Sequence, residues 1–592
     1  MINFDTVVSL DFETKKVEDG GPLLPLPVGC SIKMGRGESR YYSWGHPTEN
    51  NCTEEEFRGV IQSIWEAEWL THNGLTFDVP IAEHYFGAGL NKRDPLLTHD
   101  TLFMAYLDNP HARSLSLKDL ADDLLGMPPE EQQEMYDWIM ANVPECRTRK
   151  QCGAYISEAP GEMVGRYAKG DTDRTHALAE YLAPVLEAME EAYNRERMLA
   201  PILADIQNRG VRCDVERLRE DYRAALDKKH RLEDMIREHL KQGPHFNPGS
   251  DKELGEVLVR LGYSGFMTTP TGKLSMAKPS LERVLESDPV LRSMLNSRSK
   301  YDTLTGTFMG PWLAYAEANG GRIHASYNQV RNPDGFGTRT GRLSSSKPNF
   351  QNVPTDQGLD HWGEPFPVMR SYLLPEEGHV WVCGDFKNQE PRIAAHFEEG
   401  AMMEAFNADP LLDPYMFVAK LCGIDRKPSK VIYLGILYAM GAASMADKLD
   451  VDVGQCTVWR NIIKANLPDI VELDKDCKKR FRHGLPIKTL GGRLYYCEPP
   501  SNGRSWEYKA LNTLVQGSAA DQTKQTMVFI KPYLDKIGAR LLGTVHDEIS
   551  VSCAPEHVEM VNKLMQIAAN DLPIDVPMVM DINHGASWAE AK

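Results

Sequence analysis

The chain has 592 residues, of which 42% are hydrophobic and 25% charged, and its formal net charge is −18. No apolar run reaches membrane-spanning length and no basic leader precedes an apolar stretch, so we expect a soluble protein that is not secreted. The 11 cysteines include no C-x-x-C pair, which excludes an obvious disulfide framework or zinc ribbon and fits a reducing compartment.

At about 150 residues per domain, a chain of this length should form roughly three to four compact units. The acidic net charge disfavours a nucleic-acid partner, because binding to phosphates needs local positive charge. Two basic clusters, at residues 339–342 and 475–482, leave the question open.

The first patterned segment is a predicted strand at residues 6–10 that runs into Asp11 and Glu13. Side chains alternate along a strand, so these carboxylates share a face and repel each other unless a cation lies between them. Further along, Asp78 follows an Asn-Gly loop, and Tyr167 and Asp171 share a helix face. Each element alone is typical of exposed surface. Together they predict oxygen ligands for a pair of divalent cations that activate a water for phosphoryl displacement.

Two helical runs follow, at residues 186–212 and 215–240. The second is densely charged, which favours an extended, solvated helix pair. The segment 338–354 is different, because it combines Arg, Lys, hydroxyl and amide side chains with turn residues. Such a density of donors is rare in a plain surface loop and is typical of contacts to phosphates and base edges. The candidate DNA ligands there are Arg342, Asn349, Gln351 and Asn352.

A buried strand is predicted at residues 380–383, and Asp385 follows it after a glycine. Glu390 then begins a helical pattern that has Pro391 in its first turn. A carboxylate at the mouth of a strand is a rigid position for a metal ligand. Asp385 alone is ambiguous, so a metal site here requires partners from elsewhere in the chain.

Four side chains spaced every four residues form one stripe if residues 426–438 are helical: Arg426, Lys430, Leu434 and Tyr438. Two cations at one end of the stripe suit a triphosphate, and the tyrosine at the other end suits a base. The alternative is an amphipathic helix with a basic end, and the pattern by itself does not decide between them.

A hairpin is predicted at residues 541–551, where two apolar strands flank His546, Asp547 and Glu548. This arrangement would present carboxylates at the tip of the hairpin. A His-Asp-Glu sequence alone occurs easily by chance, so its interpretation depends on the other segments.

The N-terminal residues resemble the three motifs of DnaQ-like 3′–5′ proofreading exonucleases, which are D-x-E, N-x-x-x-[FY]-D and Y-x-x-x-D. The matching residues are Asp11 and Glu13, then Asn73, Phe77 and Asp78, and finally Tyr167 and Asp171. The resemblance implies that Asp11, Glu13, Asp78 and Asp171 bind two Mg²⁺ or Mn²⁺ ions. It also implies that Tyr167 orients the attacking water.

Residues 340–352 nearly match T-G-R-L-S-S-x-x-P-N-[LF]-Q-N, a signature of family A (DNA polymerase I-like) DNA polymerases. The stretches around Asp385, Arg426 and Asp547 resemble motifs A, B and C of that family. The resemblance implies that Asp385 and Asp547 hold two Mg²⁺ ions, and that Glu390 limits the space around the sugar C2′ and excludes ribonucleotides.

The same resemblance implies roles for the remaining residues. The dNTP would contact Arg426, Lys430, Leu434, Tyr438, Glu390 and His546, and Lys430 and Glu548 would be catalytic. Asn512 and Gln516 match a helix motif, N-x-x-x-Q-G-[ST]-A-A-D, that faces the template–primer. Leu434 stands where the family usually has Phe or Tyr, which predicts altered discrimination against dideoxynucleotides. Lys387 and Pro391 also depart from the commonest motif A.

We therefore expect an α/β and α+β multidomain chain in which a DnaQ/RNase H-like exonuclease domain, residues 1–185, precedes a right-hand polymerase, residues 186–592. The polymerase would have a thumb at about 205–300, fingers at about 396–510, and a palm at about 301–395 and 511–592. Because nothing precedes the exonuclease domain, no 5′-nuclease is expected.

The expected function is template-directed DNA synthesis with 3′–5′ proofreading, in phage genome replication in the cytoplasm of an infected host. Expected partners are primer–template DNA, dNTPs, a helicase/primase and a single-strand-binding protein, with no membrane and a monomeric state. A single-subunit RNA polymerase is a rival within the fold, and Glu390 and the exonuclease motifs argue against it. A non-catalytic DNA-binding subunit is a second rival, and both carboxylate sets argue against that.

Overall fold

The computed structural model describes residues 2–16, 24–269, 271–331, 337–355 and 358–592. These residues form two compact units. The first unit comprises Met1–Arg209, Ala325–Gln351 and Val382–Asn583. The second comprises Gly210–His324, Asn352–Trp381 and His584–Lys592. Among the described residues, no helix is both long and apolar enough to span a bilayer.

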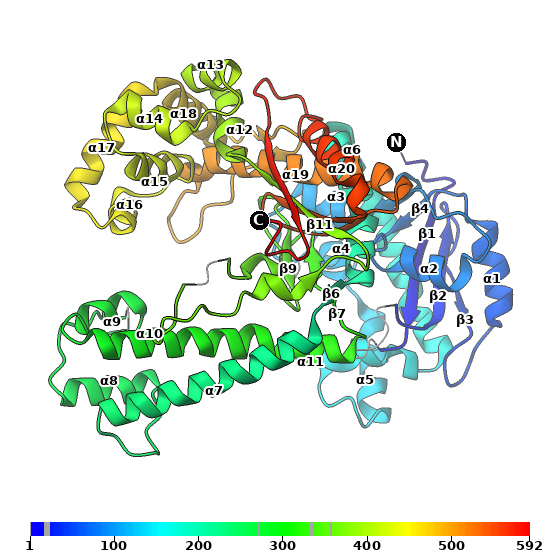
Figure 1. Cartoon of the computed structure of the whole chain (residues 1–592). Helices are drawn as coiled ribbons and strands as arrows, with labels where there is room; N and C mark the ends of the chain where they lie inside the picture. The colour runs from blue at the N-terminus through cyan, green and yellow to red at the C-terminus, as the bar shows by residue number, and fades with distance from the viewer. Residues whose placement is uncertain (1, 17–23, 270, 332–336, 356–357) are drawn as a thin grey trace. The chain divides into compact units, whose positions relative to one another are not determined.

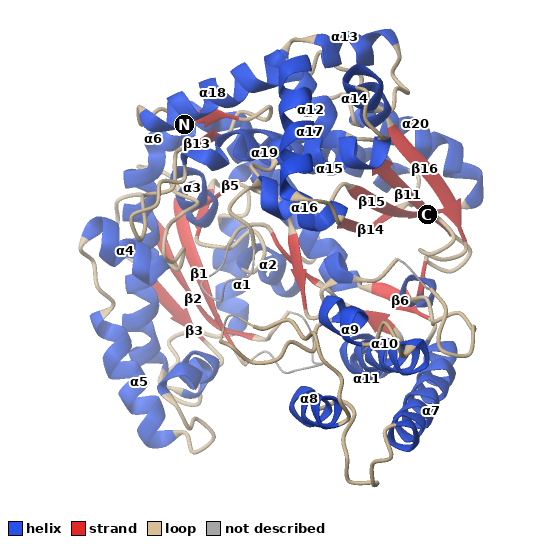
Figure 2. Cartoon of the chain, turned by 90° about the vertical axis from the view of Figure 1, so that its left-hand side faces the viewer, coloured by secondary structure: helices blue, strands red, loops and turns tan. Residues whose placement is uncertain are grey.

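The N-terminal part of the first unit is built on a mixed five-stranded sheet with the order β3-β2-β1-β4-β5 (Figure 2). Strand β1 pairs antiparallel with β2 and parallel with β4, which in turn pairs parallel with β5. The strand bounds are β1 Val8–Thr14, β2 Pro27–Met34, β3 Arg40–Ser43, β4 Trp69–Thr71 and β5 Thr98–Asp100. Around the sheet lie α1 Glu54–Ser63, α2 Asp78–Phe86, α3 Thr101–Asp108, α4 Leu117–Leu125 and α5 Glu130–Asn142.

Strand β1 separates the core from the acidic side chains by simple alternation. Phe12 is buried and its ring lies 5.9 Å from those of Phe57 on α1 and Phe86 on α2. Asp11 and Glu13, its neighbours, therefore point to the opposite face, as the D-x-E pattern predicts. That face is covered by the long helix α6, Gly161–Arg209.

Helix α6 has 49 residues and is interrupted only by non-helical backbone at Met189. The sequence predicts a helix that begins at residue 186, but the helix begins 25 residues earlier, at Gly161, and includes Tyr167 and Asp171 (186 − 161 = 25). The predicted domain boundary at residue 185 thus lies within one helix, and it stays a prediction.

A second sheet of the first unit has the order β14-β15-β11-β16. The bounds are β14 Arg540–Val545, β15 Glu548–Cys553, β11 Val380–Phe386 and β16 Met580–Gly585. Val545 pairs with Glu548, so β14 and β15 form the predicted hairpin with His546 and Asp547 in its two-residue turn. His546 adopts φ +58°, which is typical of such tight hairpin turns. Helices α19 Ala510–Lys536 and α20 Val558–Ala568 pack together alongside this sheet.

A group of helices between β11 and α19 surrounds its own apolar core, which includes Phe406, Tyr433 and Leu437 (Figure 1). Their bounds are α12 Gln389–Glu398, α13 Ala401–Ala408, α14 Pro414–Cys422, α15 Arg426–Leu437, α16 Ala442–Leu449, α17 Val453–Asn466 and α18 Pro468–Arg482. Two short hairpins complete the first unit, β12 Ile487–Lys488 with β13 Leu494–Tyr495, and β8 Ser326–Asn328 with β9 Ser344–Ser346.

The second unit consists mainly of helices, and α7 and α10 run side by side in it (Figure 1). Helix α7 confirms the helix predicted from residue 215 onwards. The helices are α7 Val215–His239, α8 Asp251–Arg260, α9 Lys278–Val284, α10 Pro289–Thr303 and α11 Gly310–Ala318, and a small sheet has the order β10-β6-β7 (Leu373–Leu374, Val211–Cys213 and Arg322–Ile323). Asp360, which has a fully buried side chain, accepts hydrogen bonds from Lys228 on α7 and Tyr301 on α10.

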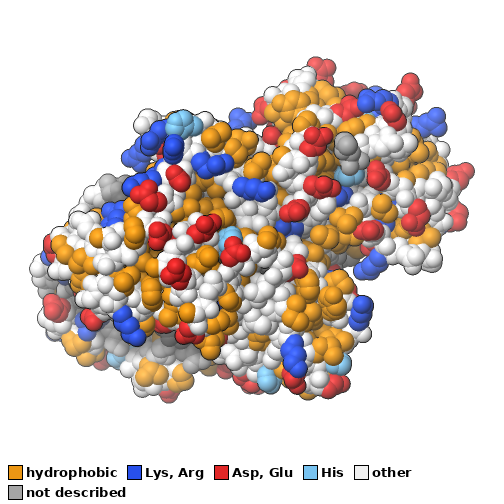
Figure 3. Space-filling view, turned by 90° about the horizontal axis from the view of Figure 1, so that it is seen from above, with side chains coloured by type: hydrophobic (Ala, Val, Ile, Leu, Met, Phe, Trp, Pro, Cys, Tyr) orange, Lys and Arg blue, Asp and Glu red, His pale blue; other side chains and the backbone are white. Residues whose placement is uncertain are grey.

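Acidic, basic and apolar side chains are interspersed over the face drawn in Figure 3. In the basic cluster of residues 475–482, Lys475, Lys478 and Arg482 pair with Glu472, Asp474 and Glu507. This cluster is therefore largely a solvated, ion-paired helix face, the simpler of the two interpretations of such a charge run.

Candidate catalytic sites

Two carboxylates meet where β11 ends beside the β14–β15 turn. Asp385 is half-buried near the end of β11, and the next residue, Phe386, donates its backbone N–H to the carbonyl oxygen of Asp547 at 3.3 Å. Burial, and then the negative charge of Asp385, raise the pKa of Asp547 to about 6. Two half-buried carboxylates this close together form an oxygen donor set that suits a hard divalent cation.

Glu390 connects three parts of the site. It lies in the first turn of α12 and is 7% exposed. One carboxylate oxygen accepts a hydrogen bond from Arg342 Nη2, and the other accepts one from the Tyr438 hydroxyl. Burial, and then the charge of Glu390, raise the pKa of Tyr438, so the phenol stays protonated and continues to donate. The Glu390 carboxylate is thus the point where three elements meet: the segment around residue 340, helix α12 and the end of helix α15.

Helix α15 has the stripe that the sequence predicts. Arg426 and Lys430 are exposed and Leu434 and Tyr438 are half-buried, whereas the intervening Ile432, Tyr433, Ile436 and Leu437 are buried in the core. The helix ends at Leu437, so Tyr438 is the first residue after it. Arg426 pairs at 2.8 Å with Asp413, which caps helix α14. Two exposed cations therefore stand at one end of the stripe and a phenol at the other.

A second acidic cluster lies between β1 and α6. Carboxylate oxygens of Asp11, Glu13 and Asp171 all lie within 4.8 Å of one another. Burial, and then the charges of Asp78 and Glu13, raise the pKa of Asp11, and burial followed by Asp171 raises that of Glu13 to about 8. Such mutual repulsion in a buried site favours a bound cation. The described acids fit that role by donor type and by spacing.

Asp78 stands beside this cluster rather than in it. It begins helix α2, and its Oδ1 accepts the backbone N–H of Phe12 at 2.7 Å. Burial raises its pKa to about 7. The sequence predicts four acids at one metal site, and the structure brings three of them together, with the fourth bound to the backbone of the strand between Asp11 and Glu13.

A cleft of about 580 Å³ opens next to the segment that precedes Asp78, and none of the four acids lines it. On one side it is lined by Asn73 and Phe77, from the N-x-x-x-[FY]-D pattern. On the other it is lined by the short strand β8 and the residues up to Arg331. Its volume is within the range of sites that hold small ligands.

The model of DNA polymerase family A matches residues 215–590, which is more than half of the chain. The chain belongs to DNA polymerase family A. It is 29% identical over 496 residues to the DNA-directed DNA polymerase of Pseudomonas phage M6, with 73% of this chain and 71% of that one covered. It is also 29% identical over 527 residues to the thermostable DNA polymerase I of Thermus aquaticus, with 83% and 59% covered. This chain thus spans less than two thirds of the Thermus relative.

The fold agrees with that membership. The POL domain of Pol1 from M. smegmatis, in a structure titled as a complex with DNA primer-template and dNTP, superposes with a TM-score of 0.78 at 22% identity. The match covers 99% of this chain and 96% of that one. The prediction of a DNA polymerase I-like, family A DNA polymerase is therefore confirmed. The family match begins at residue 215, after the acidic cluster on β1 and α6.

The predicted DNA-contacting residues of this family A polymerase differ from one another in their contacts and exposure. Gln351 donates to Thr544 O at 3.0 Å and accepts the backbone N–H of the exposed His546 at 2.8 Å, so it holds the turn that carries Asp547. Asn349 Oδ1 accepts the Gln351 N–H at 2.9 Å. Asn352 is exposed and belongs to the second unit. Asn512 and Gln516 are half-buried on one face of α19.

Glu548 differs from its predicted position. The sequence predicts both carboxylates at the tip of the hairpin, but Glu548 is the first residue of β15 and is 1% exposed. Its carbonyl oxygen accepts the Thr544 hydroxyl at 2.7 Å. The turn contains only His546 and Asp547, so Glu548, the third residue of the His-Asp-Glu run, already follows the alternation of the strand.

The two unusual residues of motif A have local explanations. Pro391 is the third residue of α12, where a backbone N–H has no partner within the helix, so the missing donor costs little. Lys387 Nζ lies 3.6 Å from Asp581 Oδ1 on β16. Neither residue displaces Asp385 or Glu390.

Sequence analysis did not identify Lys118. It follows Leu117 at the start of α4, donates to the Tyr167 hydroxyl, and its Nζ lies 3.1 Å from Asp171 Oδ2. Its Nζ also lies 3.9 Å from the centroid of the Tyr167 ring. A single lysine in an ordinary amphipathic helix carries no spacing signal, so only the packing of α4 on α6 could reveal it.

Proposed function

We propose that this family A polymerase adds dNTPs to a primer 3′-OH at the site formed by Asp385 and Asp547. The observation that carries the proposal is the meeting of these two carboxylates beside Glu390, which holds Arg342 and Tyr438. Mg²⁺ held by the two aspartates would stabilise charge on the attacking and leaving oxygens of an in-line displacement. The related M. smegmatis structure, titled with primer-template and dNTP, supports this substrate class.

The surrounding side chains would select and orient the nucleotide. Arg426 and Lys430 present exposed positive charge to the triphosphate. Leu434 and Tyr438 lie further along the same stripe, where a sugar and base would pack. Glu390, held between two donors, would stand against the sugar C2′ and reject the extra hydroxyl of a ribonucleotide. His546, exposed beside Asp547, would contact the dNTP, and Glu548 would support catalysis from its buried position on β15. The helix face with Asn512 and Gln516 would face the primer–template.

We also propose a 3′–5′ exonuclease at the N-terminal cluster, with residues 1–185 as its domain. Asp11, Glu13 and Asp171 would hold the cations, and Asp78 would support them from the neighbouring helix. Tyr167, held by Lys118, would orient the attacking water. The cleft beside Asn73 and Phe77 offers room for a frayed 3′ end. A role in phage genome replication, with a helicase/primase and a single-strand-binding protein, is the wider proposal, and the phage relative supports it.

Two variants separate the two sites. Asp547→Ala should abolish dNTP incorporation in a primer-extension assay with Mg²⁺ and leave degradation of single-stranded DNA intact. Asp11→Ala combined with Glu13→Ala should do the reverse. Loss of both activities in either variant would contradict two separate sites. A preference for rNTPs over dNTPs in the unmodified chain would instead favour an RNA polymerase.

A further inference from the structure

The backbone of the segment that carries Arg342 is held against a buried arginine. Gly341 adopts φ +89°, a conformation that favours glycine. A Cβ atom at this position would lie 1.8 Å from Nη1 of Arg493 and 2.4 Å from its Nη2. The guanidinium of Arg493 therefore packs directly on the main chain at Gly341, one residue before Arg342.

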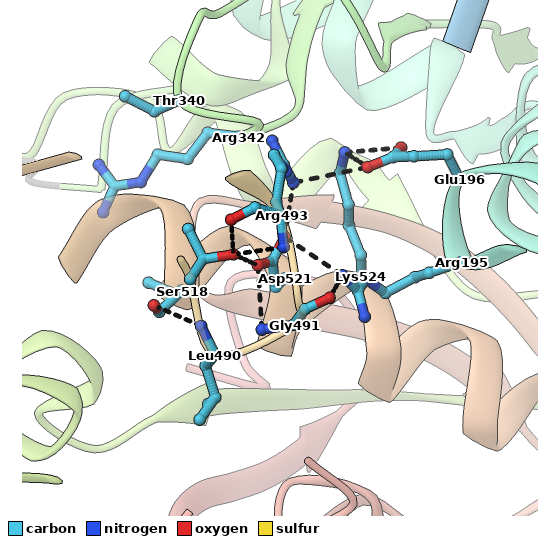
Figure 4. Close-up of polar contacts among 12 residues, drawn as sticks. Arg195, Glu196, Thr340, Arg342, Leu490, Gly491, Arg493, Ser518, Asp521 and Lys524 are labelled. Carbon is cyan, nitrogen blue, oxygen red and sulfur yellow. Dashed lines mark hydrogen bonds and ion pairs between the residues drawn. The ribbon is translucent and has the colours of Figure 1, made fainter. Parts of the chain in front are cut away.

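Arg493 is itself fixed by a buried charge cluster that Figure 4 shows. It is 1% exposed, and its Nη2 lies 2.5 Å from Asp521 Oδ1 on α19 and 3.5 Å from Glu196 Oε1 on α6. Glu196 in turn pairs with Lys524 at 2.7 Å. Buried charges persist only when they are paired and hydrogen-bonded, so each of these side chains has little freedom to move.

Tyrosines hold the same segment through its carbonyl groups. Tyr495 on β13 donates its hydroxyl to Arg339 O, and Arg493 Nη1 donates to that hydroxyl at 3.4 Å. Tyr106 on α3 donates to Thr338 O at 3.1 Å. The segment is thus fastened by Arg493, Tyr495 and Tyr106, while the Arg342 side chain extends to Glu390.

We propose that Arg493 is a positioning residue of the polymerase site. It braces the main chain at Gly341 so that Arg342 meets Glu390 in the geometry that nucleotide selection requires. The inference rests on the proposed role of Glu390 in nucleotide selection and on its contact with Arg342. It adds to them a residue that is 1% exposed and packs against the main chain at Gly341. Because Glu196 belongs to α6, the brace also connects the helix that carries Tyr167 and Asp171 to the polymerase site.

The test compares steady-state primer extension by Arg493→Lys, Arg342→Ala and the double variant. Lysine keeps the charge that faces Asp521 but lacks the planar fork that covers Gly341. We expect Arg493→Lys to lower kcat/KM for dNTPs roughly 10- to 100-fold, mainly through KM, because small displacements near a reacting group are costly. We also expect weaker discrimination between dNTPs and rNTPs, and no further loss when Arg342→Ala is added, because both changes act through one contact.

Arg370→Lys is the matched control. Arg370 is also buried, stacks on Trp588 with its guanidinium carbon 3.9 Å from the ring centroid, and belongs to the second unit. The Arg370→Lys variant should lower the melting temperature about as much as Arg493→Lys does. It should leave the KM for dNTPs and the ratio of rNTP to dNTP incorporation unchanged. If Arg493→Lys does not fold, Gly341→Ala disrupts the same contact from the other side and should reproduce the kinetic effect.

Unchanged KM and rNTP ratio in Arg493→Lys, with both altered in Arg342→Ala, would overturn the positioning role alone. Additive losses in the double variant would also overturn it. Wild-type kinetics in Arg342→Ala would remove the proposed function of Arg342, and the role of Arg493 would fall with it.

Discussion

Replacing Lys118 by methionine should slow 3′–5′ degradation of single-stranded DNA about 100-fold and leave primer extension unchanged. The lysine Nζ lies 3.1 Å from Asp171 Oδ2 and donates to the Tyr167 hydroxyl. At an effective dielectric constant of about 20, two charges at that separation attract by roughly 5 kcal/mol. That attraction, reduced by solvent because the lysine side chain is 19% exposed, positions Asp171 and Tyr167 before the reaction. Loss of one positioned donor at a reacting site typically costs roughly 100-fold in rate, or about 3 kcal/mol.

The assay is single-turnover degradation of an oligonucleotide with Mg²⁺ in excess. Lys169→Met is the matched control, because Lys169 lies on α6 two residues from both Tyr167 and Asp171. A helix turns by about 100° per residue, which places Lys169 on the other side of α6. The Lys169→Met variant should degrade DNA at the wild-type rate. The Lys118→Arg variant should retain part of the activity.

A Lys118→Met variant that matches the wild-type rate would refute the reasoning about charge and tyrosine position. Absence of exonuclease activity in the unmodified chain is a different result, since it would refute the proposed exonuclease itself. Primer extension is measured in parallel, and an equal loss there would indicate a general folding defect.

Three further predictions concern other parts of the chain. Leu434→Phe should change the ratio of dNTP to ddNTP incorporation, because an aromatic ring adds a stacking surface on α15, and equal ratios in the two proteins would count against it. Glu390→Ala should increase rNTP incorporation in competition assays, since it removes the carboxylate that Arg342 and Tyr438 hold; unchanged selectivity would exclude Glu390 as the selecting group. Asp360→Ala should destabilise the second unit by about 3 kcal/mol, measured by denaturant unfolding. Burial raises the pKa of Asp360, but hydrogen bonds from Lys228, Glu364 N–H and Tyr301 outweigh it and lower the pKa below 3.8. Its stabilisation should therefore be full above about pH 4 and be lost as the pH falls further, and the variant should lack that part of the pH dependence.

Local sequence patterns were sufficient to predict the position of a side chain wherever a single segment determines its own geometry. The alternation in β1 places Asp11 and Glu13 on the face opposite Phe12, and the hairpin signal around Asp547 predicts two strands joined by a turn that contains Asp547. The four-residue spacing on α15 likewise predicts its stripe, in which Arg426 and Lys430 are exposed and Leu434 and Tyr438 are half-buried. In each case the period of the strand or helix and the burial of one face determine which side chains share a surface. The resemblance of the polymerase motifs then led to family A, which the comparison confirmed.

Contacts between distant segments were decided only by tertiary packing. Lys118 reaches Tyr167 and Asp171 because α4 packs on α6, and Arg493 reaches Gly341 from 152 positions further along the chain (493 − 341 = 152). Asp78 binds the backbone N–H of Phe12, 66 positions earlier in the chain, for the same reason. A periodic pattern reports which face of an element is buried, but not which partner covers it. The carboxylates were therefore predictable from the sequence. Lys118, Arg493 and the contacts that Arg342 and Tyr438 make with Glu390 were not.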